Sequence, residues 1–152
     1  MTKRASDSEF DATRKAEIRG AELARRVIAS RGTSDVFELA RQACVRIVYE
    51  RWPLVTVGEY DPRAATIRVN LAALEQSRQR NEAGVAWASP KMLARMIVAH
   101  ELGHLFDMRE GSASSRNRKE DAARELMAHA FARNLLEIPF IPNCYERLWR
   151  SV

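Results

Sequence analysis

The stretch Ala99-His100-Glu101-Leu102-Gly103-His104-Leu105 contains the pattern H-E-x-x-H and holds two of the three histidines of the chain. Residues four apart lie on one face of a helix, so the imidazoles of His100 and His104 can converge on one metal ion. Glu101 lies beside them, where its carboxylate can accept a proton from a water at the open position of that metal. A polar surface helix in which the pattern occurs by chance is the alternative.

The residues around the motif predict a buried helix. Ser89-Pro90 supplies an N-cap followed by proline at the first helical position, and Gly111 is a suitable stop. Apolar residues recur at helical spacing and continue into the two histidines: Leu93, Met96 and Ile97. A histidine pair on an apolar face is costly unless its nitrogens find partners, and one metal ion provides a partner for both.

The composition favours an ordinary globular protein. The chain has 152 residues, expected to form one domain over 1–152 with residues 1–11 flexible. The net charge of +5 permits a nucleic-acid partner, but no nucleic-acid-binding motif accompanies it, so none is expected. No signal peptide and no apolar run of membrane-spanning length is present, so we expect a cytoplasmic protein without membrane contact.

Cysteine usage argues against a cysteine-based zinc site. Cys44 and Cys144 are the only cysteines, and they form no C-x-x-C pair. We expect two buried free thiols in a reducing compartment, and a single disulfide is the alternative.

The periodicity along the chain predicts an α+β fold in which a small three-stranded sheet packs against helices. Helices are expected at 12–30, 35–43, 71–80, 90–110 and 120–136, and strands at 45–49, 54–60 and 65–70. Short turns at Trp52-Pro53 and Asp61-Pro62-Arg63 separate the strands. Because short connections favour antiparallel neighbours, we expect a mainly antiparallel meander.

A third metal ligand is needed, because a catalytic zinc normally takes three protein ligands and one water. With no further histidine cluster, that ligand must be an acid or His129. The helix expected at 120–136 offers both, since Glu125 and His129 are four apart and share a face with Asp121. The residues alone leave this choice open.

The paired motifs resemble the ImmA/IrrE family of metallopeptidases. The resemblance rests on the H-E-L-G-H of residues 100–104, followed by Glu125-Leu126-Met127-Ala128-His129-Ala130-Phe131-Ala132-Arg133-Asn134-Leu135-Leu136 and Pro139. The family reads approximately A-H-E-L-G-H, a variable loop, then E-x-x-A-N-x-F-A-x-x-L-L-M-P. The resemblance extends over residues 33–139 and implies a zincin-like metallopeptidase domain.

The resemblance implies that His100, His104 and Glu125 bind Zn²⁺ and that Glu101 is the general base. The chain departs from the family at His129, where asparagine is frequent, which keeps His129 as an alternative ligand or a neighbour of the site. Met127 and one extra residue before Pro139 are further departures. An oxyanion-stabilising group is still needed, and His129, Tyr145, Tyr60 or an arginine are candidates.

The implied function is zinc-dependent hydrolysis of a peptide bond in a protein substrate. Family members characteristically cleave or inactivate a helix-turn-helix repressor, so such a repressor is the expected partner in a regulatory or mobile-element setting. In metallopeptidases of this kind the substrate commonly lies along an exposed sheet edge, for which Thr66–Asn70 is the expected strand. The alternative is a zincin-fold regulatory module that holds a protein partner with little catalysis.

Overall fold

The computed structural model describes residues 3–84, 89–111 and 118–138. Over these residues the chain forms the helices α1 (Lys3–Arg31), α2 (Val36–Gln42), α3 (Leu71–Glu82), α4 (Pro90–Arg109) and α5 (Arg118–Leu136). The strands are β1 (Arg46–Glu50), β2 (Gly58–Asp61) and β3 (Thr66–Asn70). The predicted α+β class, with a small three-stranded sheet packed against helices, is confirmed.

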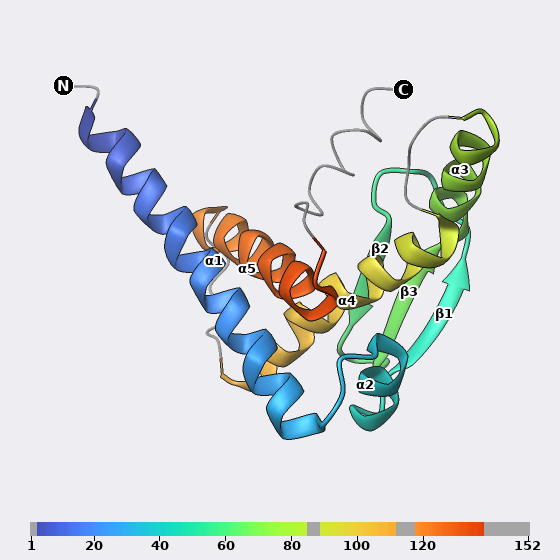
Figure 1. Cartoon of the computed structure of the whole chain (residues 1–152), viewed down its shortest axis with the longest axis horizontal. Coiled ribbons are helices and arrows are strands. Elements are labelled where there is room, and N and C mark those ends of the chain that lie inside the picture. Colours follow the sequence, from blue (N-terminus) through green and yellow to red (C-terminus); the bar gives the residue numbers. More distant parts are fainter. Residues whose placement is uncertain (1–2, 85–88, 112–117, 139–152) are drawn as a thin grey trace.

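Helix α4 is the central element of the fold. In Figure 1 it lies between the adjacent helices α1 and α5 on one side and the sheet on the other. It contacts all four other helices and the strands β2 and β3. Twelve of its twenty residues are buried, so it supplies much of the hydrophobic core. No helix in the part of the chain that the structure describes is long and apolar enough to cross a bilayer.

The ends of α4 follow the predicted signals. Ser89 has an extended backbone and its hydroxyl accepts a hydrogen bond from the amide of Met92, as an N-cap does. Pro90 occupies the first turn, and the chain leaves the helix at Gly111, whose φ of +83° suits glycine. Residues 100–104 therefore lie well inside a continuous, buried helix.

The strand order differs from the predicted meander. The sheet has the order β1-β3-β2, in which β1 is parallel to β3 and β2 is antiparallel to β3. The expectation of a mainly antiparallel sheet is therefore wrong, and the sheet is mixed. The central strand is β3, so Thr66–Asn70 is not an exposed edge, and β1 and β2 are the two edges.

Asn70 explains why β2 does not lie beside β1 in the sheet, although it follows β1 in the chain. The connection from β1 to β2 crosses the carboxyl end of β3, where the fully buried Asn70 holds it. The Asn70 side-chain amide donates to the carbonyl oxygens of Trp52 and Thr56, both at 3.0 Å, and accepts from the Trp52 amide at 3.4 Å. Its oxygen also accepts from the amide of Ala72 and caps α3. One buried side chain thus joins a strand, a loop and a helix.

The β2 strand is shorter than predicted. Residues 54–57 belong to the connection, and Leu54 and Val55 are exposed, with 80% of Val55 accessible. The apolar alternation at 54–60 therefore does not mark a buried strand face. Cys44 is also exposed and not buried as expected, whereas Cys144 lies outside the described residues.

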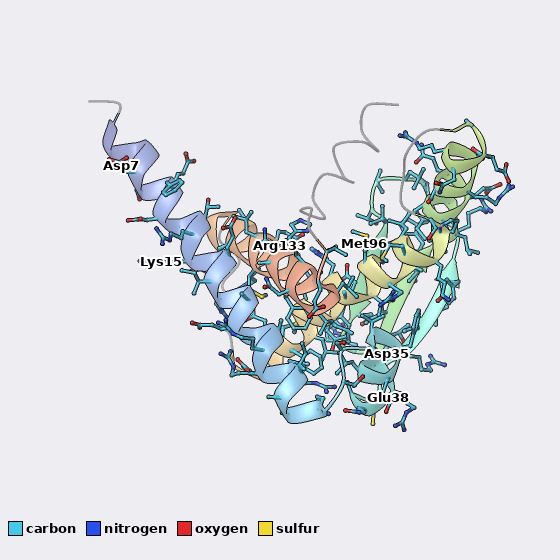
Figure 2. The ribbon with its side chains drawn as sticks, viewed as in Figure 1. Asp7, Lys15, Asp35, Glu38, Met96 and Arg133 are labelled. Atoms are coloured by element: carbon cyan, nitrogen blue, oxygen red, sulfur yellow. The ribbon has the colours of Figure 1, made fainter. Side chains whose placement is uncertain are left out.

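Helix α1 begins nine residues earlier than predicted. The sequence predicts a helix from residue 12, whereas α1 starts at Lys3. Figure 2 shows Asp7 on the part of α1 that extends beyond α5. Side chains from Asp7 to Ala12 are all exposed, so this segment is helical without packing, on local propensity alone.

We expect Asn70→Ala to lower the free energy of unfolding by about 2–4 kcal/mol, because it removes a helix cap and leaves buried backbone groups unpaired. Asp35→Ala is the matched control, since Asp35 only caps α2 by accepting from the amides of Phe37 and Glu38. Its loss should cost about 1 kcal/mol. Urea unfolding of both variants measures the difference, and equal losses would contradict the role of Asn70.

Candidate metal centre

Two helices bring three metal-binding side chains together. His100 and His104 come from α4 and Glu125 from α5, and their donor atoms all lie within 4.8 Å of one another. The two Nε2 atoms are 3.2 Å apart. Glu125 Oε2 lies 3.1 Å from Nε2 of His100, and Oε1 lies 2.9 Å from Nε2 of His104. These three side chains form a group that could hold a metal ion.

The separations fit a tetrahedral ion. A zinc ion bonded at roughly 2.0–2.1 Å to its ligands holds the ligand atoms about 3.3–3.4 Å apart. The two Nε2 atoms are 3.2 Å apart, and each lies 2.9–3.1 Å from a different oxygen of Glu125, which is near that spacing. When both Nε2 atoms are unprotonated, their lone pairs and the Glu125 carboxylate present acceptors to the same small region. A cation placed there would interact favourably with all three side chains, so these residues fit a metal ion.

Glu125 is the negative charge of this cluster. Burial opposes its ionisation, but hydrogen bonds from His100 and His104 outweigh that effect and hold the pKa of the Glu125 carboxyl well below its ordinary value. Its side chain is half exposed. Glu125 is therefore ionised at neutral pH and reachable from solvent, as a metal ligand beside an open coordination position must be.

Glu101 lies on the same helix but in a drier place. It is buried, and burial raises the pKa of its carboxyl although the nearby imidazoles of His100 and His104 oppose the rise. A carboxylate with a raised pKa is a better proton acceptor near neutral pH. Glu101 also lines the pocket beside His104 and Glu125, so it can reach a molecule bound there.

His129 lies next to the group without joining it. Its ring centroid is 4.5 Å from that of His100, with the planes at 45°. Burial and the neighbouring His100 lower the pKa of His129 to about 4, so this imidazole is neutral at pH 7. Among the described residues, no partner reaches its buried Nδ1. The structure therefore brings Glu125, and not His129 or Asp121, to the two histidines.

Gly103 allows the two helices to come this close. A Cβ built on Gly103 would lie 3.2 Å from Cα of Ala128 and 3.1 Å from the ring of Phe131, both in α5. A larger residue at this position would therefore press on α5, the helix that carries Glu125. The small residue within the H-E-x-x-H motif was visible in the sequence, but its partner on α5 was not.

A pocket of about 570 Å³ opens in front of the group. Glu101, His104 and Glu125 line it together with residues that the sequence did not place in the site: Gly58, Glu59, Pro62, Asp107 and Met108. Of the candidates for oxyanion stabilisation, Tyr60 and one arginine, Arg124, line the pocket. His129 is not among the lining residues, and Tyr145 lies outside the described residues.

The edge strand β2 forms one wall of this pocket. A Cβ on Gly58 would overlap the side chain of Ile97 and lie 3.6 Å from Glu101 Oε1, so the strand backbone lies directly against α4. The amide of Asn70 donates to the carbonyl of Val57, which directs Val57 and Glu59 toward β3. Gly58 and Tyr60 alternate with them and present their backbone groups at the open edge.

Comparisons with models of known families, with curated proteins and with solved structures gave no match for this chain. What the site can do therefore follows from its residues and their geometry.

We expect the protein to bind one zinc ion per chain. Glu125→Gln should weaken zinc binding more than about a hundredfold, which exceeds the usual loss when a residue that only hydrogen-bonds to a metal ligand is replaced. His129→Gln should change the affinity by less than about tenfold, because His129 only supports His100. Chelator competition measures both, with Asp121→Asn as control. A larger loss in His129→Gln than in Glu125→Gln would contradict this ligand assignment.

Proposed function

We propose that this protein is a zinc-dependent endopeptidase with a zincin-like site, in which His100, His104 and Glu125 hold Zn²⁺. The observation that carries the proposal is the convergence of these three donors beside a buried glutamate, at the wall of a pocket bordered by an open strand edge. Two histidines and one glutamate form one of the known donor sets of catalytic zinc, and this set leaves a position for water.

The bound metal would polarise the substrate carbonyl and make a water molecule more acidic. Glu101 accepts the proton of the attacking water, since its buried carboxylate has a raised pKa and faces the same pocket. It then returns this proton to the leaving amine. Tyr60 and Arg124 are the lining residues whose O–H or N–H groups can donate to the developing oxyanion.

The substrate is best accommodated as an extended strand along β2. Among the residues that the structure describes, none pairs with the outward backbone groups of Gly58 and Tyr60 at the pocket wall. An extended peptide that pairs with them passes in front of Glu101. Main-chain pairing of this kind needs an unfolded segment of the substrate. This favours an endopeptidase that cuts a flexible region of a protein.

The resemblance to ImmA/IrrE peptidases nominates a helix-turn-helix repressor as the protein substrate. The competing function is a regulatory module that holds such a partner without cleaving it. An ionisable, buried Glu101 beside the donor group favours the enzyme, because burying a carboxylate is costly and a purely binding module gains nothing from it.

We expect Glu101→Gln to retain zinc but to lower peptide cleavage by about 10²–10⁴-fold, the usual contribution of a general base. Cleavage is measured by mass spectrometry on a proteome-derived peptide library and on a co-encoded repressor. Glu110→Gln, at the exposed end of the same helix, is the control. Zinc binding with no cleavage by the wild-type protein would favour the binding module, and unchanged cleavage in Glu101→Gln would remove the base assignment.

We expect an intact peptide that the wild-type protein cleaves to bind zinc-loaded Glu101→Gln and to slow hydrogen exchange at the amides of Gly58 and Tyr60. These amides point to the open edge and gain partners only when a strand pairs with β2. The other edge strand, β1, contributes no residue to the pocket and is the internal control. Protection confined to Arg46–Glu50 would place the substrate on the wrong edge for this proposal.

A further inference from the structure

Helix α1 contacts both helices that carry the candidate ligands, through two consecutive residues. Arg19 pairs with Asp107 of α4, three residues after His104. Gly20 meets α5 at Met127, two residues after Glu125. Both contacts therefore lie within a helical turn of a candidate ligand, although α1 contributes no donor itself and lies outside the segment that resembles a peptidase family.

Gly20 brings α1 and α5 into backbone contact. A Cβ at Gly20 would overlap the carbonyl oxygen of Met127 and lie 2.7 Å from Cβ of Ala130 and 2.8 Å from the amide nitrogen of Phe131. Two of these three atoms are backbone atoms, which cannot rotate away as a flexible side chain can. Any side chain at position 20 must therefore displace α1 or α5.

Gly103 meets the same turn of α5 from the other helix. A Cβ there would contact Ala128 and Phe131 at 3.1–3.3 Å. Gly20 and Gly103 thus contact adjacent faces of α5, and Phe131 touches both. Both contacts are close, and Glu125 lies at the start of the turn that they share.

Arg19 fixes the other ligand-bearing helix to α1. Asp107 is almost fully buried, with 4% of its side chain exposed, and Arg19 is its ion-pair partner. A buried carboxylate is held firmly by its cation, because separating the pair leaves a charge in a poorly solvated place. Asp107 also lines the pocket beside His104, so the pair acts at the site and not at a distant surface.

We infer that Arg19 and Gly20 are positioning residues that set the distance between the histidines of α4 and Glu125 of α5. Arg19 holds α4 at Asp107, Gly20 admits α5 at Met127, and their adjacency in one rigid helix couples the two. This inference rests on the proposed metal site. The two residues affect metal affinity and coordination geometry, and they take no part in the chemical step.

The chain offers matched controls for both residues. Gly32 follows α1 at φ +73° with no atom within 4 Å of its Cβ position, so Gly32→Ala costs stability through backbone strain without touching α5. Arg26 also pairs from α1 to α4, with Glu110, but both side chains are about half exposed and lie away from the pocket. Arg26→Gln therefore removes the same charge outside the site.

The test compares Gly20→Ala and Arg19→Gln with these controls by Zn²⁺ affinity from chelator competition and by the absorption spectrum of bound Co²⁺. Gly20→Ala should weaken zinc binding by about 10–100-fold, the range for lost outer support, and alter the Co²⁺ bands. Arg19→Gln should weaken it by about tenfold. Loss of a positive charge alone would strengthen cation binding, so the direction separates positioning from electrostatics.

Arg19→Lys should recover part of the affinity lost in Arg19→Gln, while Gly32→Ala and Arg26→Gln should match the wild type. Folded Gly20→Ala and Arg19→Gln proteins with wild-type affinity and spectrum would overturn the inference. If Gly20→Ala fails to fold, the Arg19 variants decide by the same criteria.

A wild-type protein that binds no zinc would end the metallopeptidase proposal, and the positioning role is then judged on the metal-free protein. NMR signals of the His100 and His104 rings should move in Gly20→Ala and stay in Gly32→Ala, because only the first displaces Glu125 from the rings. Unmoved ring signals in Gly20→Ala would overturn the inference.

Discussion

The distance between α4 and α5 is the constraint on which the candidate site depends. Helices with ordinary side chains at their contact lie 8–10 Å apart, and the imidazoles and the carboxylate are short. His100, His104 and Glu125 meet at about 3 Å only because small residues stand at the crossing, with Gly103 against Ala128. Gly20 extends the same principle to an adjacent face of α5, so that three helices share one closely packed region.

This packing brings a cluster of polar groups together within a largely apolar core. Two imidazoles face each other, Glu101 is a buried carboxylate, and His129 is held neutral with a pKa of about 4. Such an arrangement costs stability, and it persists because the surrounding apolar core and the Arg19–Asp107 pair determine the backbone around it. Polar groups placed against local rules by a rigid scaffold are the usual mark of a functional site.

The sequence was sufficient for the features that local signals determine. Ser89-Pro90 and Gly111 delimit α4, and the H-E-x-x-H spacing alone places His100 and His104 on one face. Strand order was beyond such signals, because the β1–β2 connection follows its path only when Asn70 binds Trp52 and Thr56 from the end of β3. The apolar run at 54–57 resembles a strand in sequence, but it belongs to this connection. The strand order that results makes β2 an edge of the sheet.

The choice between Glu125 and His129 also needed the structure, and helical geometry explains why. Glu125 precedes Ala128 and His129 follows it, both within one turn of α5. Helical periodicity alone therefore allows either residue to be the third ligand. At 100° per residue, Glu125 lies roughly 60° from Ala128 around the helix, and His129 lies roughly 100° away. Because Ala128 faces Gly103, the residue nearer to it in angle points at the histidines. The rotation of α5, set by the glycines on α1 and α4, therefore decides which side chain completes the donor group.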